Sequence, residues 1–297
     1  MNKVFVISLL ILFFGIIGVF AVAFFQSSFT KVDIYKEERL EGDQIEDIEI
    51  NTSSTDVEVV PSETSEIVVL LDGKINKDLE DKYKLSVDHS HNKLSINYVL
   101  DENIVGVKLG SAQDTQIQVK VPDKAFNYFQ AKTSSGEILI NNLEVNEINV
   151  ESTSGDQSII NTEAQGHITS RSTSGNISTR KSKVNSANYF ATSGNIDVNN
   201  LSSEDSVFKT SSGNITFNGE QLKSNMEYET SSGDVAIKFS QTPKSVWLDF
   251  KTSSGKPEIS IEDLSFEDKS KNSTIGVKGN GDYEIKVRTT SGDLTLE

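Results

Sequence analysis

The sequence contains no cysteine and only three histidines in 297 residues. Without cysteine, the chain can form neither disulfides nor thiolate metal sites, and an N-terminal cysteine cannot carry a lipid. With so few histidines and no Gly-x-Ser-x-Gly motif, a Ser-His-Asp arrangement is not expected. We therefore expect no catalytic residue, no metal site and no cofactor.

Positive charge is also scarce. The 28 Lys and Arg stand against 44 Asp and Glu, which gives a formal net charge of −16 and disfavours a nucleic-acid partner. Between Glu37 and Glu66, Arg39 is the only basic residue. Two interpretations are open: a solvated stalk with the first strands, or a patch that attracts cationic peptides or divalent ions near a membrane. The acids of this stretch are Glu37, Glu38, Glu41, Asp43, Glu46, Asp47, Glu49, Asp56, Glu58, Glu63 and Glu66.

One long apolar run lies at the N-terminus. Residues 4–25 are apolar apart from Ser8 and two glycines, and as a helix they would extend about 33 Å, enough to span a bilayer. Lys3 before the run favours an N-terminus inside and the remainder outside. A cleaved signal peptide is the alternative, because Ala21-Val22-Ala23 resembles a cleavage site. The length favours an uncleaved single-pass anchor in the cell membrane, with an extracytoplasmic C-terminal domain.

A tetrapeptide of Thr/Ser/Ala, Ser/Thr, Ser and Gly recurs eight times and is mostly followed by Asp or Asn. Successive copies are 19, 20, 19, 19, 20, 22 and 37 residues apart, and a period near 20 is typical of stacked structural units. The tetrapeptides end at Gly136, Gly155, Gly175, Gly194, Gly213, Gly233, Gly255 and Gly292.

Each repeat alternates around its glycine with a period of two. Apolar residues predominate five and seven positions before the glycine and two and four after it, so we expect two short strands per repeat with one buried face. In the central repeat Phe208, Ile215 and Phe217 should be buried and stacked on their equivalents. The position four before the glycine is polar in every repeat except at Phe190: Lys132, Glu151, Arg171, Lys209, Glu229, Lys251 and Arg288.

Such repeats bury their apolar face only when stacked, so the predicted fold is all-β, a β-solenoid of about 20-residue coils. We expect the eight glycines at corresponding corners, mostly with positive φ, as structural turn residues. The following residues, mostly Asn and Asp, predict a turn-capping ladder. The alternative, a Ca²⁺ column, is disfavoured because three central members are neutral Asn.

Four regions follow along the chain. We expect a membrane anchor or signal peptide at 1–30, a polar acidic linker at 31–43, an irregular β-rich part at 44–124, and the regular solenoid at 125–297 with an irregular insertion at 256–282. Thr55 stands where a degenerate first coil would have its glycine. His89 and His91 should lie on one strand face, as exposed hairpin residues rather than as metal ligands.

The anchor, the repeated Thr-Ser-Ser-Gly-Asp/Asn motif and the segment Ile117-Gln118-Val119-Lys120-Val121-Pro122 together carry a family likeness. Over roughly residues 45–297 the chain resembles the LiaG-like putative-adhesin family of Gram-positive envelope proteins. The resemblance implies a β-solenoid ectodomain linked to cell-envelope stress genes and to responses to membrane-active antimicrobials. It supplies no catalytic residues.

Three functions compete. The first is a non-enzymatic, membrane-anchored envelope protein, binding or regulatory in envelope stress or adhesion, with cationic peptides or envelope proteins as partners. The second is a filament or scaffold that self-associates end to end, because a strand at residues 294–297 could leave an uncapped edge. The third is a carbohydrate-active β-helix enzyme, which would need carboxylates facing each other in a groove.

Overall fold

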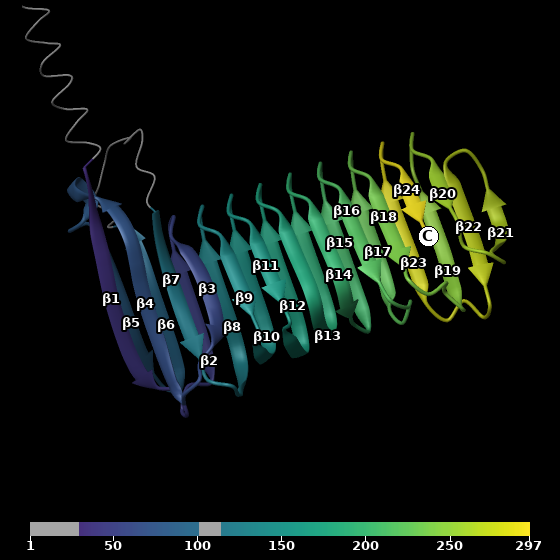
Figure 1. Ribbon diagram of the computed structural model, residues 1–297. Coiled ribbons are helices and arrows are strands. Elements are labelled where there is room, and N and C mark those ends of the chain that lie inside the picture. Colours follow the sequence, from purple (N-terminus) through teal and green to yellow (C-terminus); the bar gives the residue numbers. More distant parts are fainter. Residues whose placement is uncertain (1–29, 101–113) are drawn as a thin grey trace, which may run out of the picture.

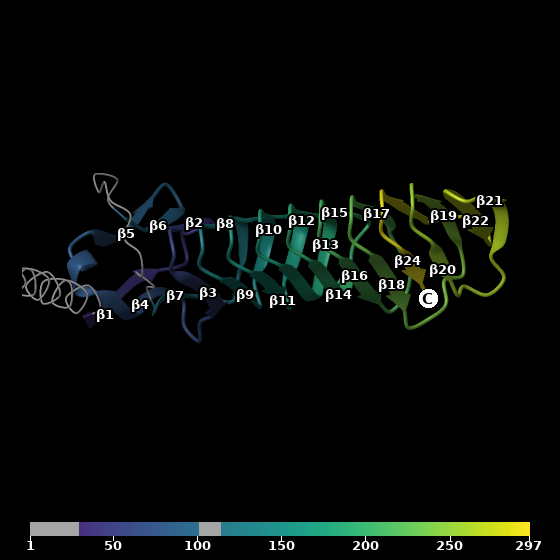
Figure 2. The same cartoon turned by 90° about the horizontal axis from the view of Figure 1, so that it is seen from above.

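The computed structural model describes residues 30–100 and 114–297, and these residues form a long rod of stacked strands (Figure 1). Each coil contributes a strand to each of two ladders, which lie on opposite sides of the rod (Figure 2). In this part of the chain the single helical element is the 3-10 turn η1 (Lys77–Leu79). The predicted all-β solenoid is therefore confirmed.

The first ladder runs in this spatial order: β1 (Lys31–Glu41), β4 (Glu66–Asn76), β7 (Asp114–Val121), β3 (Asp56–Pro61), β9 (Ile138–Asn141), β11 (Gln157–Ile160), the start of β13 (Ile177–Ala191), β14 (Ile196–Ser202), β16 (Ile215–Gly219), β18 (Val235–Phe239), β24 (Leu294–Leu296) and β20 (Pro257–Ile259).

The second ladder runs in this order: β5 (Tyr83–Ser90), β6 (Lys93–Leu100), β2 (Asp47–Thr52), β8 (Ala125–Thr133), β10 (Glu144–Ser152), β12 (Glu163–Ser172), the end of β13, β15 (Asp205–Thr210), β17 (Asn225–Thr230), β23 (Glu284–Thr289), β19 (Val246–Lys251), β22 (Ser273–Lys278) and β21 (Ser265–Lys269).

The core is a set of columns in which equivalent side chains stack along the rod. The Phe208 ring centroid lies 5.5 Å from that of Tyr189 in the preceding coil and 4.8 Å from that of Tyr228 in the following one. It also lies 6.0 Å from the ring of Phe217 on the opposite ladder. Phe208, Ile215 and Phe217 are buried, so the predicted register is confirmed.

Near the C-terminus the order of coils in space departs from their order in sequence. The coil β23–β24 lies between β17–β18 and β19–β20, with parallel pairing on both sides (Figure 1). The chain passes one coil position, forms β19–β20 and the antiparallel strands β21 and β22, and then returns to fill the position it passed. The expected uncapped edge at residues 294–297 is therefore wrong, because β24 lies inside the ladder.

The N-terminal end is built in a related way. The coil β2–β3 lies between the strands β6 and β7 on one side and the coil β8–β9 on the other. Thr55 is the residue that faces Gly136, as the degenerate first coil predicts. Between β3 and β8 the chain makes the end of the rod, with β4 antiparallel to β7 and β5 antiparallel to β6.

The predicted polar linker at 31–43 is wrong, because residues 31–41 form strand β1, which pairs with β4 along its whole length. Val32, Ile34 and Leu40 are half-buried against the core, and charged residues occupy most other positions. Unpaired edges are often protected by such charges. In residues 30–100 and 114–297 no helix is long and apolar enough to cross a membrane; the predicted span at 4–25 lies outside them.

Candidate binding surface

The eight motif glycines stack directly on one another at one corner of the rod. A Cβ atom added to Gly213 would lie 2.0 Å from the carbonyl oxygen of Gly194, and one added to Gly233 would lie 1.7 Å from that of Gly213. No side chain fits at such a distance. The expected positive φ is wrong, since the glycines with positive φ among the described residues are Gly73, Gly279 and Gly281. Close approach of neighbouring backbones, rather than turn conformation, requires the motif glycine.

Positive φ occurs at the opposite corner, six residues after the glycine. Asn142, Asn161, Lys181 and Asn200 have φ between 49° and 55°. Asparagine tolerates this conformation better than other residues with a side chain. Asn thus recurs in the sequence at a fixed distance after the motif, and this second signal marks the opposite corner.

The small hydroxyl residue three positions before the glycine ties adjacent coils together. The Thr210 hydroxyl accepts a hydrogen bond from the Gly213 N–H (3.2 Å) and donates one to the carbonyl of Gly194 in the preceding coil (3.1 Å). Thr230 makes the equivalent pair with Gly233 and Gly213. A buried hydroxyl is thereby satisfied at each of these corners, which explains why Ser and Thr dominate there.

The residue after the glycine forms the predicted Asn/Asp ladder. The Asn176 side-chain oxygen accepts from the backbone N–H of Asn195 (3.0 Å), and Asn195 accepts in the same way from Asn214 (2.8 Å). The ladder continues through Asp234 and Asp293 to the N–H of Lys256. Each side-chain oxygen thus binds a backbone N–H of the next coil, as in a turn cap.

Two hydroxyl residues per coil, directly before the glycine, project from the same corner. All are exposed, and none makes a side-chain hydrogen bond to the residues that the structure describes. Their backbone N–H groups hold the corner, for example Ser193 to the Thr173 carbonyl at 2.8 Å. We call this row the hydroxyl ridge: Ser134, Ser135, Thr153, Ser154, Thr173, Ser174, Thr192, Ser193, Ser211, Ser212, Ser231, Ser232, Thr290, Ser291, Ser253 and Ser254.

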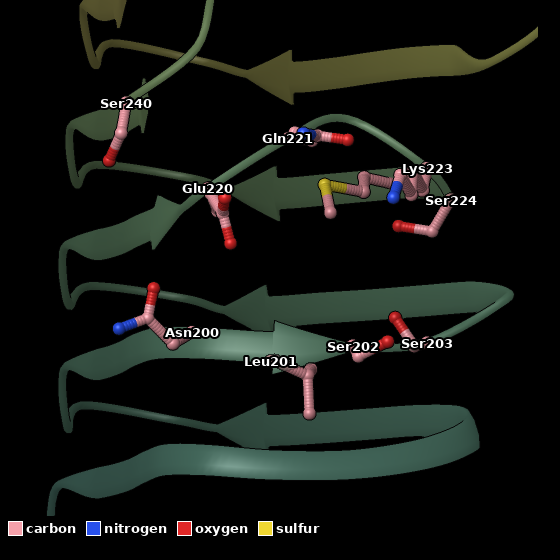
Figure 3. Close-up of a pocket in the computed structure, with 10 residues that line it drawn as sticks. Asn200, Leu201, Ser202, Ser203, Glu220, Gln221, Lys223, Ser224 and Ser240 are labelled. Atoms are coloured by element: carbon pink, nitrogen blue, oxygen red, sulfur yellow. The ribbon is translucent and has the colours of Figure 1, made fainter.

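A shallow polar groove of about 420 Å³ opens at the opposite corner, between the loops that follow β14 and β16 (Figure 3). Its single carboxylate, Glu220, accepts a hydrogen bond from the side-chain amide of Gln241 (2.9 Å). Gln221 donates to Gln241, and Lys223 completes the charged lining. Glycoside hydrolysis generally requires two carboxylates, so this groove lacks that arrangement.

The acidic stretch does not form one patch. Asp47 and Glu49 belong to the second ladder, whereas Glu37, Glu58 and the other acids of β1, β3 and β4 belong to the first. Several are already engaged with neighbours: Arg39 with Glu37 (2.6 Å) and Glu66 (3.2 Å), and Lys93 with Glu49 (2.6 Å). The concentration of charge in the sequence is therefore diluted over two sides of the rod.

The two neighbouring histidines lie at a hairpin tip. His89 is near the end of β5, and His91 and Asn92 both have positive φ in the turn before β6. Both histidines are exposed and line a hollow of about 570 Å³ together with Glu41 and Asp43. Among the residues described, no three His, Asp or Glu side chains lie close enough together to hold a metal ion.

The pKa shifts reflect packing and ion pairs. Burial raises the pKa of the Tyr98 phenol to about 12 and also raises those of Tyr189 and Tyr228. Burial tends to raise the pKa of Glu227, but its hydrogen bond to Lys209 and the charges of Lys209 and Lys286 outweigh this and lower it. These shifts therefore describe structural contacts rather than a reactive centre.

A family model described as Toastrack DUF4097 matches residues 45–297. No curated protein matches the chain. The chain is weakly similar to solved structures of two putative adhesins: one from Bacteroides fragilis (10% identity, TM-score 0.45) and one from Parabacteroides distasonis (10% identity, TM-score 0.41), each covering 89% of this chain and 97% of its own. A putative lipid binding protein from Parabacteroides distasonis has 14% identity and TM-score 0.34, with the same coverage. Likenesses this weak say nothing about ligand or activity.

Proposed function

Because the chain belongs to the Toastrack DUF4097 family, we propose that it is a non-enzymatic binding protein of the cell envelope. In this proposal residues 4–25 form an uncleaved membrane anchor, and the rod projects on the outer side of the cell membrane. The LiaG-like resemblance supports a binding role in envelope stress or adhesion.

The observation that supports this proposal is the repetition of the surface. The hydroxyl ridge and the Asn/Asp ladder present the same groups coil after coil, on a rigid apolar core. An active site needs a few groups that converge on one reacting atom, whereas a repeating surface suits an extended partner. The solenoid therefore favours binding over catalysis.

Protease treatment of intact protoplasts that carry the full chain tests the location. Added protease should digest the rod, while a cytoplasmic marker protein stays intact, and alkaline carbonate should leave the chain in the membrane fraction. Protection of the rod until the protoplasts are lysed would contradict the proposal. Release by carbonate would contradict the anchor alone.

End-to-end filament formation has less support than binding. The ladder edges are β1, which is rich in charge, β5, which carries Lys84 and Asp88, β20, which is three residues long and begins with Pro257, and β21, which has an irregular register between Phe266 and Asp268. Each of these features hinders pairing with another strand. Sedimentation velocity of the detergent-solubilised chain should show one species whose size does not rise with concentration.

Cationic peptides are a second proposed partner, attracted by the net charge of −16. Binding of such a peptide to the full chain should weaken as salt rises, because the screening length falls from about 10 Å at 0.1 M to about 3 Å at 1 M. A variant with Gln or Asn at all eleven acids of residues 37–66 should bind less. Equal binding by both proteins would exclude this stretch as the attracting site.

A further inference from the structure

One column of outward side chains on the second ladder carries alternating charge. It consists of the residues four positions before each motif glycine, which we call the outer charge column: Lys132, Glu151, Arg171, Phe190, Lys209, Glu229, Arg288 and Lys251 in spatial order. Cross-strand neighbours of opposite charge stabilise a sheet, and like charges destabilise it. The alternation of this column is therefore a stabilising feature of the stack.

The alternation fails where Arg288 and Lys251 stand side by side with like charges, and it fails at Phe190. Its neighbours in the column are Arg171 and Lys209, so an acid would continue the pattern at this position. Lys209 obtains its counter-charge from Glu227 (3.1 Å) and Glu229 (2.9 Å). Arg171 makes no salt bridge with the described residues, and Glu151, the acid next to it, pairs with Lys132 at 3.2 Å. Arg171 thus forms no salt bridge of its own, although it stands beside Glu151 and attracts that carboxylate, which Lys132 also binds.

The Arg171 guanidinium contacts the aromatic ring of Phe190, which stands at the column position where an acid would continue the alternation. It lies 4.8 Å from the centroid of Phe190, in a cation–π contact. Arg171 is exposed, so its N–H edges face solvent. A guanidinium fixed in this way can bind a carboxylate with two parallel hydrogen bonds and loses little side-chain freedom in doing so.

A hollow of about 360 Å³ adjoins this pair. It forms where the small inward residue of the corner is Ser152, Ser172 and Ala191 in three successive coils, instead of the Thr found in most other coils. Its rim carries the exposed hydroxyls of Thr173 and Thr192, which belong to the hydroxyl ridge. The hollow therefore combines a cation, an aromatic ring and free hydroxyls, and the Glu151 carboxylate, which is paired with Lys132, also lines it.

We infer that the Arg171–Phe190 hollow binds a uronic acid residue of an extended, mostly neutral glycan. The carboxylate pairs with the Arg171 guanidinium, the apolar face of the sugar packs against Phe190, and sugar hydroxyls meet Thr173 and Thr192. The rest of the glycan follows the hydroxyl ridge, whose groups repeat at the spacing of strands, about 4.8 Å. A densely charged polyanion is excluded because the protein itself is strongly acidic.

This inference rests on the proposed binding role and gives its ligand a chemical class. The probe is a neutral tetrasaccharide that carries one glucuronic acid residue, titrated calorimetrically into the detergent-solubilised full chain. Two further probes are the same oligosaccharide with its carboxyl reduced to an alcohol, and a tetrapeptide with one free carboxylate. The wild-type chain should bind the acidic oligosaccharide at least about tenfold more tightly than either comparison probe.

Phe190→Glu is the decisive variant, because it places an acid between Arg171 and Lys209 and supplies Arg171 with an internal counter-ion. It should weaken binding of the acidic oligosaccharide about tenfold or more without lowering the melting temperature. Arg171→Gln should weaken binding similarly. Lys251→Gln, in the same column but outside the hollow and near Asp249 (3.8 Å), is the matched control and should leave affinity unchanged.

Equal affinity of Phe190→Glu and wild type, or equal binding of the carboxyl-reduced probe, would overturn the inference. Tighter binding of the tetrapeptide would overturn the assignment to a glycan. If wild type and Phe190→Glu bind isolated cell envelopes equally, the proposed function is retained and only this site is excluded. Failure of the wild-type chain to bind either envelopes or the acidic oligosaccharide would remove both.

Discussion

The middle of the rod and its two ends are built by different rules. From β10 to β16 each coil lies next to the coils that precede and follow it in sequence, with parallel pairing throughout. At each end a coil lies between segments that are remote in sequence, and antiparallel strands close the ladder. The middle is thus held by local periodicity, and the ends are held by long-range pairing.

This difference has an energetic consequence. In a solenoid, stability is roughly a sum of contacts between neighbouring coils. A coil in the middle has a partner on each side, whereas an edge strand such as β20 has one, β24. The inserted coil β23–β24 is the link by which the C-terminal end gains its contact with the middle.

Deletion of residues 283–297 should have the largest effect. Without β23 and β24, the strands β19 and β20 lose their parallel neighbours, and β21 and β22 are joined to the rod only through β19, while the coils from β8 to β16 keep their neighbours. Hydrogen exchange should show loss of protection across residues 246–278 and retained protection across residues 125–219. A synthetic peptide of residues 283–297 should restore protection; uniform loss along the whole rod would refute the distinction between the two regions.

Gly213→Ala should be the most destabilising single substitution of this set. Its Cβ would lie 2.0 Å from the Gly194 carbonyl oxygen, so two coils must separate, at a cost of about 3–5 kcal/mol. Thr55→Ala at the equivalent position of the first coil is the control. It removes a hydroxyl contact with Thr115 (2.8 Å) and should cost about 1 kcal/mol. Similar urea midpoints for the two variants would contradict the close-approach explanation.

Ile237→Ala and Ile259→Ala compare the same side chain at equivalent positions of the two regions. Ile237 is buried between Phe217 and Leu296, whereas Ile259 is partly exposed at the edge and pairs only with Leu296. We expect a loss of about 2–4 kcal/mol at Ile237 and about 1 kcal/mol at Ile259. Equal losses in denaturant unfolding would mean that the end is packed as tightly as the middle.

The smallest effect should come from pH. Burial opposes ionisation of Glu227, but Lys209 and, on the inserted strand β23, Lys286 lower its pKa below the ordinary value. A carboxylate with a lowered folded-state pKa contributes stability above its unfolded-state pKa and loses it as pH falls through the folded-state value. Between about pH 5 and pH 3 the melting temperature of Glu227→Gln should therefore fall less than that of wild type. Glu204→Gln, at an exposed position, is the control.

Much of the middle could be predicted from the sequence, because each coil repeats the same local pattern. The columns through Phe208 and Phe217, the small hydroxyl column and the Asn/Asp ladder all followed from alternation around the glycine. The reason why glycine is required could not be predicted, because the distance between neighbouring coils is a property of the stack and cannot be read from one repeat. The positions of β1 and of β23–β24 depend on pairing between distant segments, which periodicity does not encode.

The candidate binding surface was predictable only in part. The exposed Ser and Thr of the motif were visible, and Phe190 stood out as an exception among polar residues. The meaning of that exception depended on the structure, since only the pairing of the strands shows that Phe190 stands between Arg171 and Lys209. The hollow beside Phe190 could also be recognised only in the structure, because it forms where three small residues of successive coils lie next to one another.

Residues 283–297 follow the other coils in the sequence but lie between two of them in the rod, and this determines the order in which the rod can be assembled. A chain emerges from the ribosome with its N-terminal part first, and the middle coils can stack as they appear. The coil position between β17–β18 and β19–β20 stays vacant until residues 283–297 emerge. A product cut short before this segment would expose an open seam with unpaired strand edges, which proteases and chaperones can recognise. Residues 246–278 therefore gain their parallel contacts with the middle of the rod only after residues 283–297 have been made.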